Sequence, residues 1–569
     1  MKKLISLLLV FAMLFSFVAC SSTNEKTTEA SNSGTNTTVE DTTTESTTET
    51  PEKPVADLSD PRVRKAFAYA IDMETLVAGL FEGKAITTNS LTPASDEWSV
   101  DGLTDYDYNP ELAKQLLEEA NWDFDYELDV VYYYGDDQTV DLMVAIQAYL
   151  DAVGVKMTFR KIEGDTAAQL WTPPTDPVNG PSAIDWDLAY AGIAALTLHD
   201  YYGRFETAAS NNSHTPTDEA LDKQIEITNT NADLTAQEAA FGEIQKIMNE
   251  ELYVIPLYNQ QLFIYESDRV DRNGIAYGNE QYNYDWGIIN WNVEARDGKN
   301  VLYTGGAPVE AFPAPFVNPG LDITNKLIFD RLIQANASLT PTDGMLAESY
   351  TLSDDGKTLV FEIRDGVKWH DGKEFTAEDV EFTINYMGKV PTLTSIAKNT
   401  IKSLAGYEAY LNGETDSISG VVVDGNTVTL TFEMLDPNAL VTFSQWPMLP
   451  KHLLEGSDPT LAEQNAFWLN PVGTGPFALT EVSFNDFAVF ERNEDYFIEG
   501  TGNIDTIQMT IGGENEGNIV LNAEAGYVDY AFGKSVPDAK SIEQISNMNV
   551  VPVDIRYTRL FYVNKFPQK

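Results

Sequence analysis

Few residues of this chain could perform covalent or metal chemistry, and their spacing does not fit it. The four histidines are His199, His214, His370 and His452, and none has a second histidine at metal-ligand spacing. Cys20 is the only cysteine, so no intrachain disulfide can form. The sequence therefore predicts neither a bound metal nor a cofactor.

Two short motifs look like parts of catalytic or nucleotide sites, but each lacks its companions. Ser395-Ile-Ala-Lys398 has the spacing of an acylating Ser-x-x-Lys pair, yet the Ser-Asp-Asn and Lys-Thr-Gly motifs are missing. Gly473-Thr-Gly475 is followed by Pro476 and has no Lys-Ser/Thr at P-loop spacing. We therefore expect a protein that is not an enzyme.

The charge of the chain also restricts its partners. Its 569 residues include 88 acidic and 36 basic side chains, which gives a formal net charge of −52. Such a field repels nucleic acid and favours solubility. With 43% apolar and 11% aromatic residues, the chain has the composition of a globular protein long enough for two or three domains.

The N-terminus has the pattern of a secretory signal. Lys2-Lys3 precede an apolar run over residues 4–18, which is too short to span a bilayer. Phe17-Val-Ala-Cys20 is similar to a bacterial lipobox. We predict that residues 1–20 are a lipoprotein signal peptide and that Cys20 carries the lipid, with ordinary secretory cleavage as the alternative. The protein would then lie outside the cytoplasm, anchored to the outer face of the cell membrane through this lipid only.

Residues 21–57 differ from the rest of the chain in composition and in predicted secondary structure. Residues 21–57 are rich in Thr, Ser and Glu with almost no large apolar side chains, which predicts a disordered tether. From Leu58 to residue 297, predicted helices (61–71, 140–153) alternate with predicted strands (126–134, 155–162). From Gly298 strands predominate, including 358–363 and a hairpin over 421–432. The pattern is that of an α/β protein.

Several longer motifs carry a family resemblance. They are Met345-Leu-Ala-Glu-Ser-Tyr350, Val367-Lys-Trp-His-Asp-Gly372, Val472-Gly-Thr-Gly-Pro-Phe477, Asp60-Pro-Arg-Val-Arg-Lys-Ala-Phe-Ala-Tyr-Ala-Ile-Asp72 and Leu560-Phe-Tyr-Val-Asn564. Together they resemble the family 5 extracellular solute-binding proteins, the dipeptide, oligopeptide and nickel receptors of ABC importers. In that family the segment like 560–564 directly precedes the segment like 60–72. Here the two stand at opposite ends, so the chain looks like a circular permutant.

The resemblance implies a two-lobed periplasmic-binding-protein type II fold with an extra inserted domain, in circularly permuted order. Residues 298–569 would form the first lobe with the small inserted domain, and residues 58–297 the ligand-binding second lobe. We expect only the segment near 270–300 to cross covalently between them. The implied function is that of a monomeric receptor that closes over a solute by hinge motion and delivers it to an ABC permease complex.

The segment that selects the ligand in this family follows an Asp-x-Asp-Leu strand, here Asp185-Trp-Asp187-Leu188. In peptide receptors it continues Trp-x-x-Asp, and that Asp pairs with the α-ammonium of the peptide. This chain lacks both residues, so either Asp200 takes the role or the ligand has no buried amine. The predicted ligand-binding residues are Tyr190, Ile193, Ala194, His199, Asp200, Tyr202, Phe316 and Trp446.

These residues leave the ligand class open. An oligopeptide-like solute is the first expectation. An oligosaccharide is the main alternative, because it needs aromatic faces and neutral hydrogen-bonding groups, which Tyr190, Tyr201, Tyr202 and Trp446 could offer. A nickel chelate near His199, a surface receptor without a transport role, and an extracellular hydrolase are the remaining alternatives.

Overall fold

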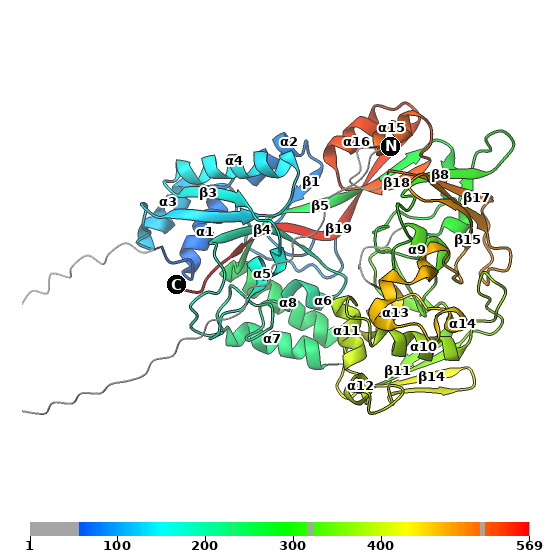
Figure 1. Cartoon of the computed structure of the whole chain (residues 1–569). Helices are drawn as coiled ribbons and strands as arrows, with labels where there is room; N and C mark the ends of the chain where they lie inside the picture. Colours follow the sequence, from blue (N-terminus) through cyan, green and yellow to red (C-terminus); the bar gives the residue numbers. More distant parts are fainter. Residues whose placement is uncertain (1–55, 232, 317–322, 513–517, 568–569) are drawn as a thin grey trace, which may run out of the picture. The chain divides into compact units, whose positions relative to one another are not determined.

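The computed structural model describes residues 56–231, 233–316, 323–512 and 518–567 (Figure 1). It is a mixed α/β structure, which agrees with the predicted fold class. The predicted signal peptide, the lipidation site Cys20 and nearly all of the predicted tether lie outside the described residues and stay predictions.

An eleven-stranded sheet forms the centre of the described structure. Two long antiparallel strands, β5 (Val254–Ser267) and β19 (Met548–Val563), pair along most of their length at its centre (Figure 1). The full order is β15-β16-β17-β8-β18-β5-β19-β4-β2-β3, and β1 pairs with β5. The other strands are β15 (Phe477–Ser483), β16 (Phe487–Arg492), β17 (Thr506–Thr510), β8 (Val301–Gly305), β18 (Tyr530–Gly533), β4 (Leu188–Ala194), β2 (Glu127–Tyr132), β3 (Lys156–Lys161) and β1 (Ala85–Thr87).

Helices from the first part of the chain cover the strands β4, β2 and β3. Asp60 caps the first of them, because its carboxylate accepts a hydrogen bond of 2.8 Å from the backbone N of Arg62, and Pro61 stands in the first turn. The helices are α1 (Pro61–Ala70), α2 (Met73–Leu80), α3 (Pro110–Glu119), α4 (Asp137–Ala152), α5 (Thr166–Trp171), α6 (Leu198–Tyr202), α7 (Glu219–Thr230) and α8 (Leu234–Glu251).

The later part of the chain adds a separate four-stranded sheet, β11-β12-β14-β13. Its strands β11 (Ala347–Leu352) and β12 (Thr358–Ile363) pair, and β13 (Val421–Asp424) and β14 (Thr427–Thr431) form the predicted hairpin. Smaller pairs are β9 (Ile333–Ala335) with β10 (Pro341–Gly344), and β6 (Val270–Asp271) with β7 (Asn292–Val293). The helical segments here are η1 (Ile288–Asn290), α9 (Ile323–Ile328), α10 (Ala377–Met387), α11 (Ser395–Lys402), α12 (Tyr407–Leu411), α13 (Ala439–Gln445), α14 (Lys451–Leu454), η2 (Pro459–Gln464), η3 (Ala466–Leu469), α15 (Ile519–Glu524) and α16 (Val536–Glu543).

The two faces of β4 and β19 support different cores. Side chains alternate between faces along a strand. On β4, Tyr190 packs into one hydrophobic cluster and Ile193 into another. On β19, Arg556 contacts the loop that contains Asp96, whereas Arg559 contacts Tyr134. We call these two sides of β19 the Arg556 face and the Arg559 face.

The expectation of a single covalent crossing near residues 270–300 is wrong. β5 pairs with β1 at residues 258–260 and with β18 near its end, and β19 pairs with β4 through its second half. Both long strands are continuous and pass from one half of the sheet to the other. The division into lobes at residues 297/298 stays a prediction.

The first and last described segments meet at Tyr253. The Arg64 guanidinium of α1 lies 5.6 Å from the centre of the Tyr253 ring. Lys565 donates from Nζ to the backbone oxygen of Tyr253 at 2.8 Å. Residues 60–72 and 560–564 resemble two segments that follow one another directly in the family. In this chain the two segments are therefore neighbours in space.

Candidate functional site

The segment after β4 is where the family resemblance places the ligand, and the structure shows how its first residues lie. Tyr190 is buried on the Arg559 face, with its hydroxyl 2.7 Å from that of Tyr258. Ile193 is buried in the core on the opposite side of β4. Ala194 is exposed at the end of β4 and pairs with Tyr557 of β19.

Asp200 uses its carboxylate within its own turn. One carboxylate oxygen accepts hydrogen bonds from the backbone N of Leu196 and of Thr197, both at 2.9 Å, and from the Thr197 hydroxyl at 3.2 Å. These contacts complete a capping box at the start of α6. Burial raises the pKa of Asp200, against the effect of these bonds. The local structure thus already holds the carboxylate that was expected to bind an ammonium group.

His199 lies directly before Asp200 in α6 and is half-buried. Its ring packs edge-on against Tyr202 at 5.5 Å between centres. Among the described residues, no three His, Cys, Asp or Glu side chains come together as a metal site.

The three other aromatic residues that were predicted to bind the ligand lie in hydrophobic cores. Tyr202, Phe316 and Trp446 are exposed by only 1%, 0% and 3%, and Tyr202 belongs to a different core from the other two. The structure does not bring these three side chains to one open surface. Their proposed role in ligand binding would require the cores to open.

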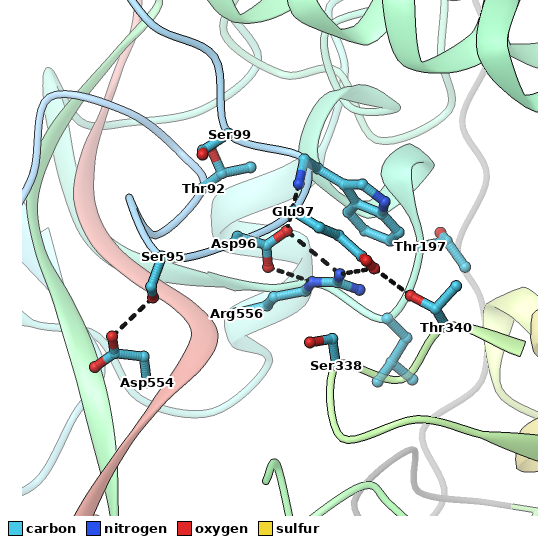
Figure 2. Close-up of polar contacts among 12 residues, drawn as sticks. Thr92, Ser95, Asp96, Glu97, Ser99, Thr197, Ser338, Thr340, Asp554 and Arg556 are labelled. Carbon is cyan, nitrogen blue, oxygen red and sulfur yellow. Dashed lines mark hydrogen bonds and ion pairs between the residues drawn. The ribbon is translucent and has the colours of Figure 1, made fainter.

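A polar cluster that sequence analysis missed lies on the Arg556 face, beside this segment (Figure 2). Arg556 donates from Nε to Asp96 at 2.6 Å and from Nη2 to Glu97 at 3.4 Å. The guanidinium also lies over the ring of Trp98, 3.4 Å from its centre. The side chains of Arg556 and Asp96 are 4% and 7% exposed, so this pair is a buried anchor for the loop.

Glu97 is the accessible member of the cluster. Its side chain is 44% exposed, and it accepts a hydrogen bond from the hydroxyl of Thr340 in the later part of the chain (Figure 2). The backbone N of Ala195 donates to the backbone oxygen of Arg556 at 3.0 Å, which ties the cluster to the segment after β4. A small cavity of about 140 Å³ borders Asp96, Arg556 and Ser338.

The cluster has two carboxylates and one guanidinium, so it has an excess of one negative charge. A half-exposed carboxylate beside a buried, compensated ion pair can accept hydrogen bonds from a cationic group. The local signal for this site was the run Asp96-Glu97-Trp98. Its partner Arg556 lies 460 residues away, so local patterns could not reveal the pair.

The chain belongs to a known family. Its residues 21–210 and 342–566 match the model described as bacterial extracellular solute-binding proteins, family 5 middle. This confirms the predicted family and the two-lobed fold class that the family implies, whereas the permuted order stays a prediction. It also confirms the expectation that the chain is not an enzyme, since the family consists of solute-binding proteins. Within the described part of the chain, no helix has both the length and the apolar character needed to cross a membrane.

Similar proteins are described as peptide-binding. The oligopeptide-binding protein AppA of Bacillus subtilis is 30% identical over 213 residues, which is 36% of this chain and 35% of that protein. Di/tripeptide-binding protein 3 of Pseudomonas aeruginosa is 26% identical over 275 residues, 44% of this chain and 48% of that protein. The chain thus spans less than half the length of these curated relatives.

Two solved structures align with part of this chain. The structure of AppA from Bacillus subtilis in complex with a nonapeptide is 25% identical and aligns with a TM-score of 0.35, over 43% of this chain and 46% of that chain. The structure of OppA from Haemophilus influenzae in complex with a peptide is 22% identical, with a TM-score of 0.34, over 41% of this chain and 46% of that chain.

Proposed function

We propose that this solute-binding protein captures an oligopeptide-like solute and delivers it to an ABC permease. The observation that carries the proposal is the family match over residues 21–210 and 342–566. The names of the relatives support a peptide as the solute. The protein would work as a monomer that closes over its ligand without covalent chemistry.

Within this proposal, Glu97 binds the α-ammonium group of the peptide. The family aspartate for this role is missing, and Asp200 is engaged in its capping box. A buried ammonium without a carboxylate would cost several kcal/mol, so a peptide receptor needs another acid near the segment after β4. Glu97 supplies an accessible one, on a loop that Arg556 and Trp98 hold in place.

The solute class is tested by capture from mixtures. The purified protein is incubated with a protease digest of casein or with maltooligosaccharides, separated from free solute by gel filtration, and denatured to release what it bound. Mass spectrometry should find peptides enriched from the digest and no sugar retained. Retention of oligosaccharides without peptides would contradict the peptide assignment.

We also propose that the receptor is held at the outer face of the cell membrane by a lipid on Cys20, with residues 21–57 as its tether. The motive is the single cysteine directly after a short apolar run. Cys20→Ala should move the protein from the membrane fraction to the medium or periplasm, as measured by cell fractionation. Unchanged membrane association would overturn the anchor and leave the binding function untouched.

A further inference from the structure

A second, larger cavity lies on the Arg559 face, on the other side of β19 from Glu97. Its volume is about 860 Å³. The first turns of α4 and α16 form two of its walls, and strands β4, β5 and β19 form its floor. Ion pairs of Lys84 with Glu543 and of Lys540 with Glu82 hold the segment around β1 against α16. The cavity therefore has defined walls on both sides.

Arg559 lines this cavity without an acidic partner. Its Nε donates to the side-chain oxygen of Gln260 at 3.0 Å, and its guanidinium lies 3.7 Å from the centre of the Tyr134 ring and 4.9 Å from that of Tyr557. Its Nη1 is buried and has no hydrogen-bond partner among the described residues. No carboxylate within the described ranges forms an ion pair with it.

The other charged groups of the walls have partners or roles of their own. Asp136 caps α4 by accepting from the backbone N of Thr139 at 2.8 Å, and Asp137 belongs to the first turn of that helix. Asp538 stands in the first turn of α16. Of the basic groups, Lys84 is paired with Glu543, and Lys534 donates to the side-chain oxygen of Gln281 at 2.9 Å. Arg559 therefore differs from Lys84 and Lys534 in having a buried N–H group, at Nη1, with no hydrogen-bond partner among the described residues.

Arg559 is half-buried, and charges held largely out of water in proteins are normally paired, because leaving one uncompensated is unfavourable. Aromatic faces stabilise a guanidinium, but they do not satisfy its N–H groups. The walls near Arg559 are aromatic, formed by Tyr134, Tyr190, Tyr258 and Tyr557. Such a setting suits a ligand with an acidic group for the guanidinium and a flat apolar body for the rings.

We propose that this cavity binds a small aromatic carboxylate, with its carboxylate on Arg559 and its ring against the tyrosines. The site lies on the face of β19 opposite to the proposed peptide site, so both ligands could be bound together. The inference goes beyond the proposed function and does not depend on the identity of the transported solute.

Benzoate is the probe, and benzyl alcohol is its uncharged counterpart. Calorimetric titration of the full chain should show benzoate binding and much weaker binding of benzyl alcohol. Gln260→Glu places a carboxylate beside Arg559 without changing side-chain size. It should weaken benzoate binding roughly tenfold or more, the loss expected when an internal acid competes for the same guanidinium. It should also raise the melting temperature, because the half-buried cation gains a charged partner.

Gln464→Glu is the matched control. Gln464 is exposed at the end of η2. Its replacement by Glu therefore adds the same charge away from the cavity and should leave benzoate binding unchanged. Arg559→Met should abolish benzoate binding in a protein that still melts cooperatively. Absence of benzoate binding to the natural chain would overturn the proposal. Equal benzoate binding by the natural chain and Gln260→Glu would also overturn it, even if Arg559→Met fails to fold.

Discussion

Glu97 carries the charge on which the proposed peptide recognition depends. Glu97→Gln removes the accessible carboxylate and keeps its hydrogen bond with Thr340 possible. Because the side chain is partly solvated, the expected loss of affinity for a captured peptide is about tenfold, or about 1.4 kcal/mol. Calorimetry measures this, and N-acetylation of the peptide should produce a similar loss.

The control for this variant is Glu481→Gln on the exposed edge of β15, which makes the same charge change far from the cluster. It should leave the affinity unchanged. Full peptide affinity in Glu97→Gln would show that the ammonium group is bound elsewhere.

Asp330 determines a pH dependence of stability. Burial raises its pKa to about 6, although Arg331 and hydrogen bonds from Tyr496 and Thr474 oppose the shift. The unfolded chain releases this proton near pH 4, so the folded state holds the extra proton between about pH 4 and pH 6. The free energy of unfolding should fall as the pH rises through this window, by up to about 3 kcal/mol.

Asp330→Asn removes the titrating group and keeps an acceptor for one of the two hydrogen bonds, since Tyr496 donates to one carboxylate oxygen and Thr474 to the other. Urea unfolding between about pH 4 and pH 7 should show a smaller fall for the variant than for the natural chain. Parallel stability curves for the two proteins would exclude Asp330 as the cause.

Single elements of the fold follow well from local sequence. The predicted helix over 61–71 and the predicted strand over 358–363 are present as α1 and β12. Local patterns do not report burial by distant parts of the chain. For this reason Phe316 and Trp446 were predicted to bind the ligand but lie in a core, and the pairing of Arg556 with Asp96 was not predicted.

α6 offers a test of whether Asp200 is a helix cap or a ligand contact. Asp200→Ala removes the acid of the capping box and should lower the free energy of unfolding by about 1 kcal/mol. Peptide affinity should change little. Asp379→Ala removes the matching acid from the same kind of capping box in α10, and also the acceptor of the Lys451 backbone N, so it should lower stability by more. A large loss of peptide affinity in Asp200→Ala alone would return the ammonium role to Asp200.

For the whole molecule, we propose that the chain is a circular permutant of its family. The meeting of Arg64 and Lys565 at Tyr253 supports this, because the ends of a permuted domain must lie close together. A rewired chain would run from Gly298 to Lys569, cross a short Gly/Ser linker, and continue from Leu58 to Asp297. The new cut falls in an exposed turn between β7 and β8, where cutting is well tolerated.

This rewired chain should fold and bind captured peptides with the same affinity, because both long strands stay intact. Circular dichroism and calorimetry measure the two properties. A linker of the same length inserted at 297/298 of the natural order is the control for the cut. If the control folds and the rewired chain is insoluble, the permutation proposal fails.

Hydrogen exchange with and without a bound peptide tests most directly where this protein binds its proposed solute. A peptide recovered from the digest is added back at saturation, and the exchange rates of backbone amides are compared with and without it. Peptide capture on the Arg556 face predicts slower exchange in residues 93–99, 194–200 and 337–340, with α4 and α16 unchanged. Slower exchange confined to α4 and α16, or no change in any of these segments, would contradict it.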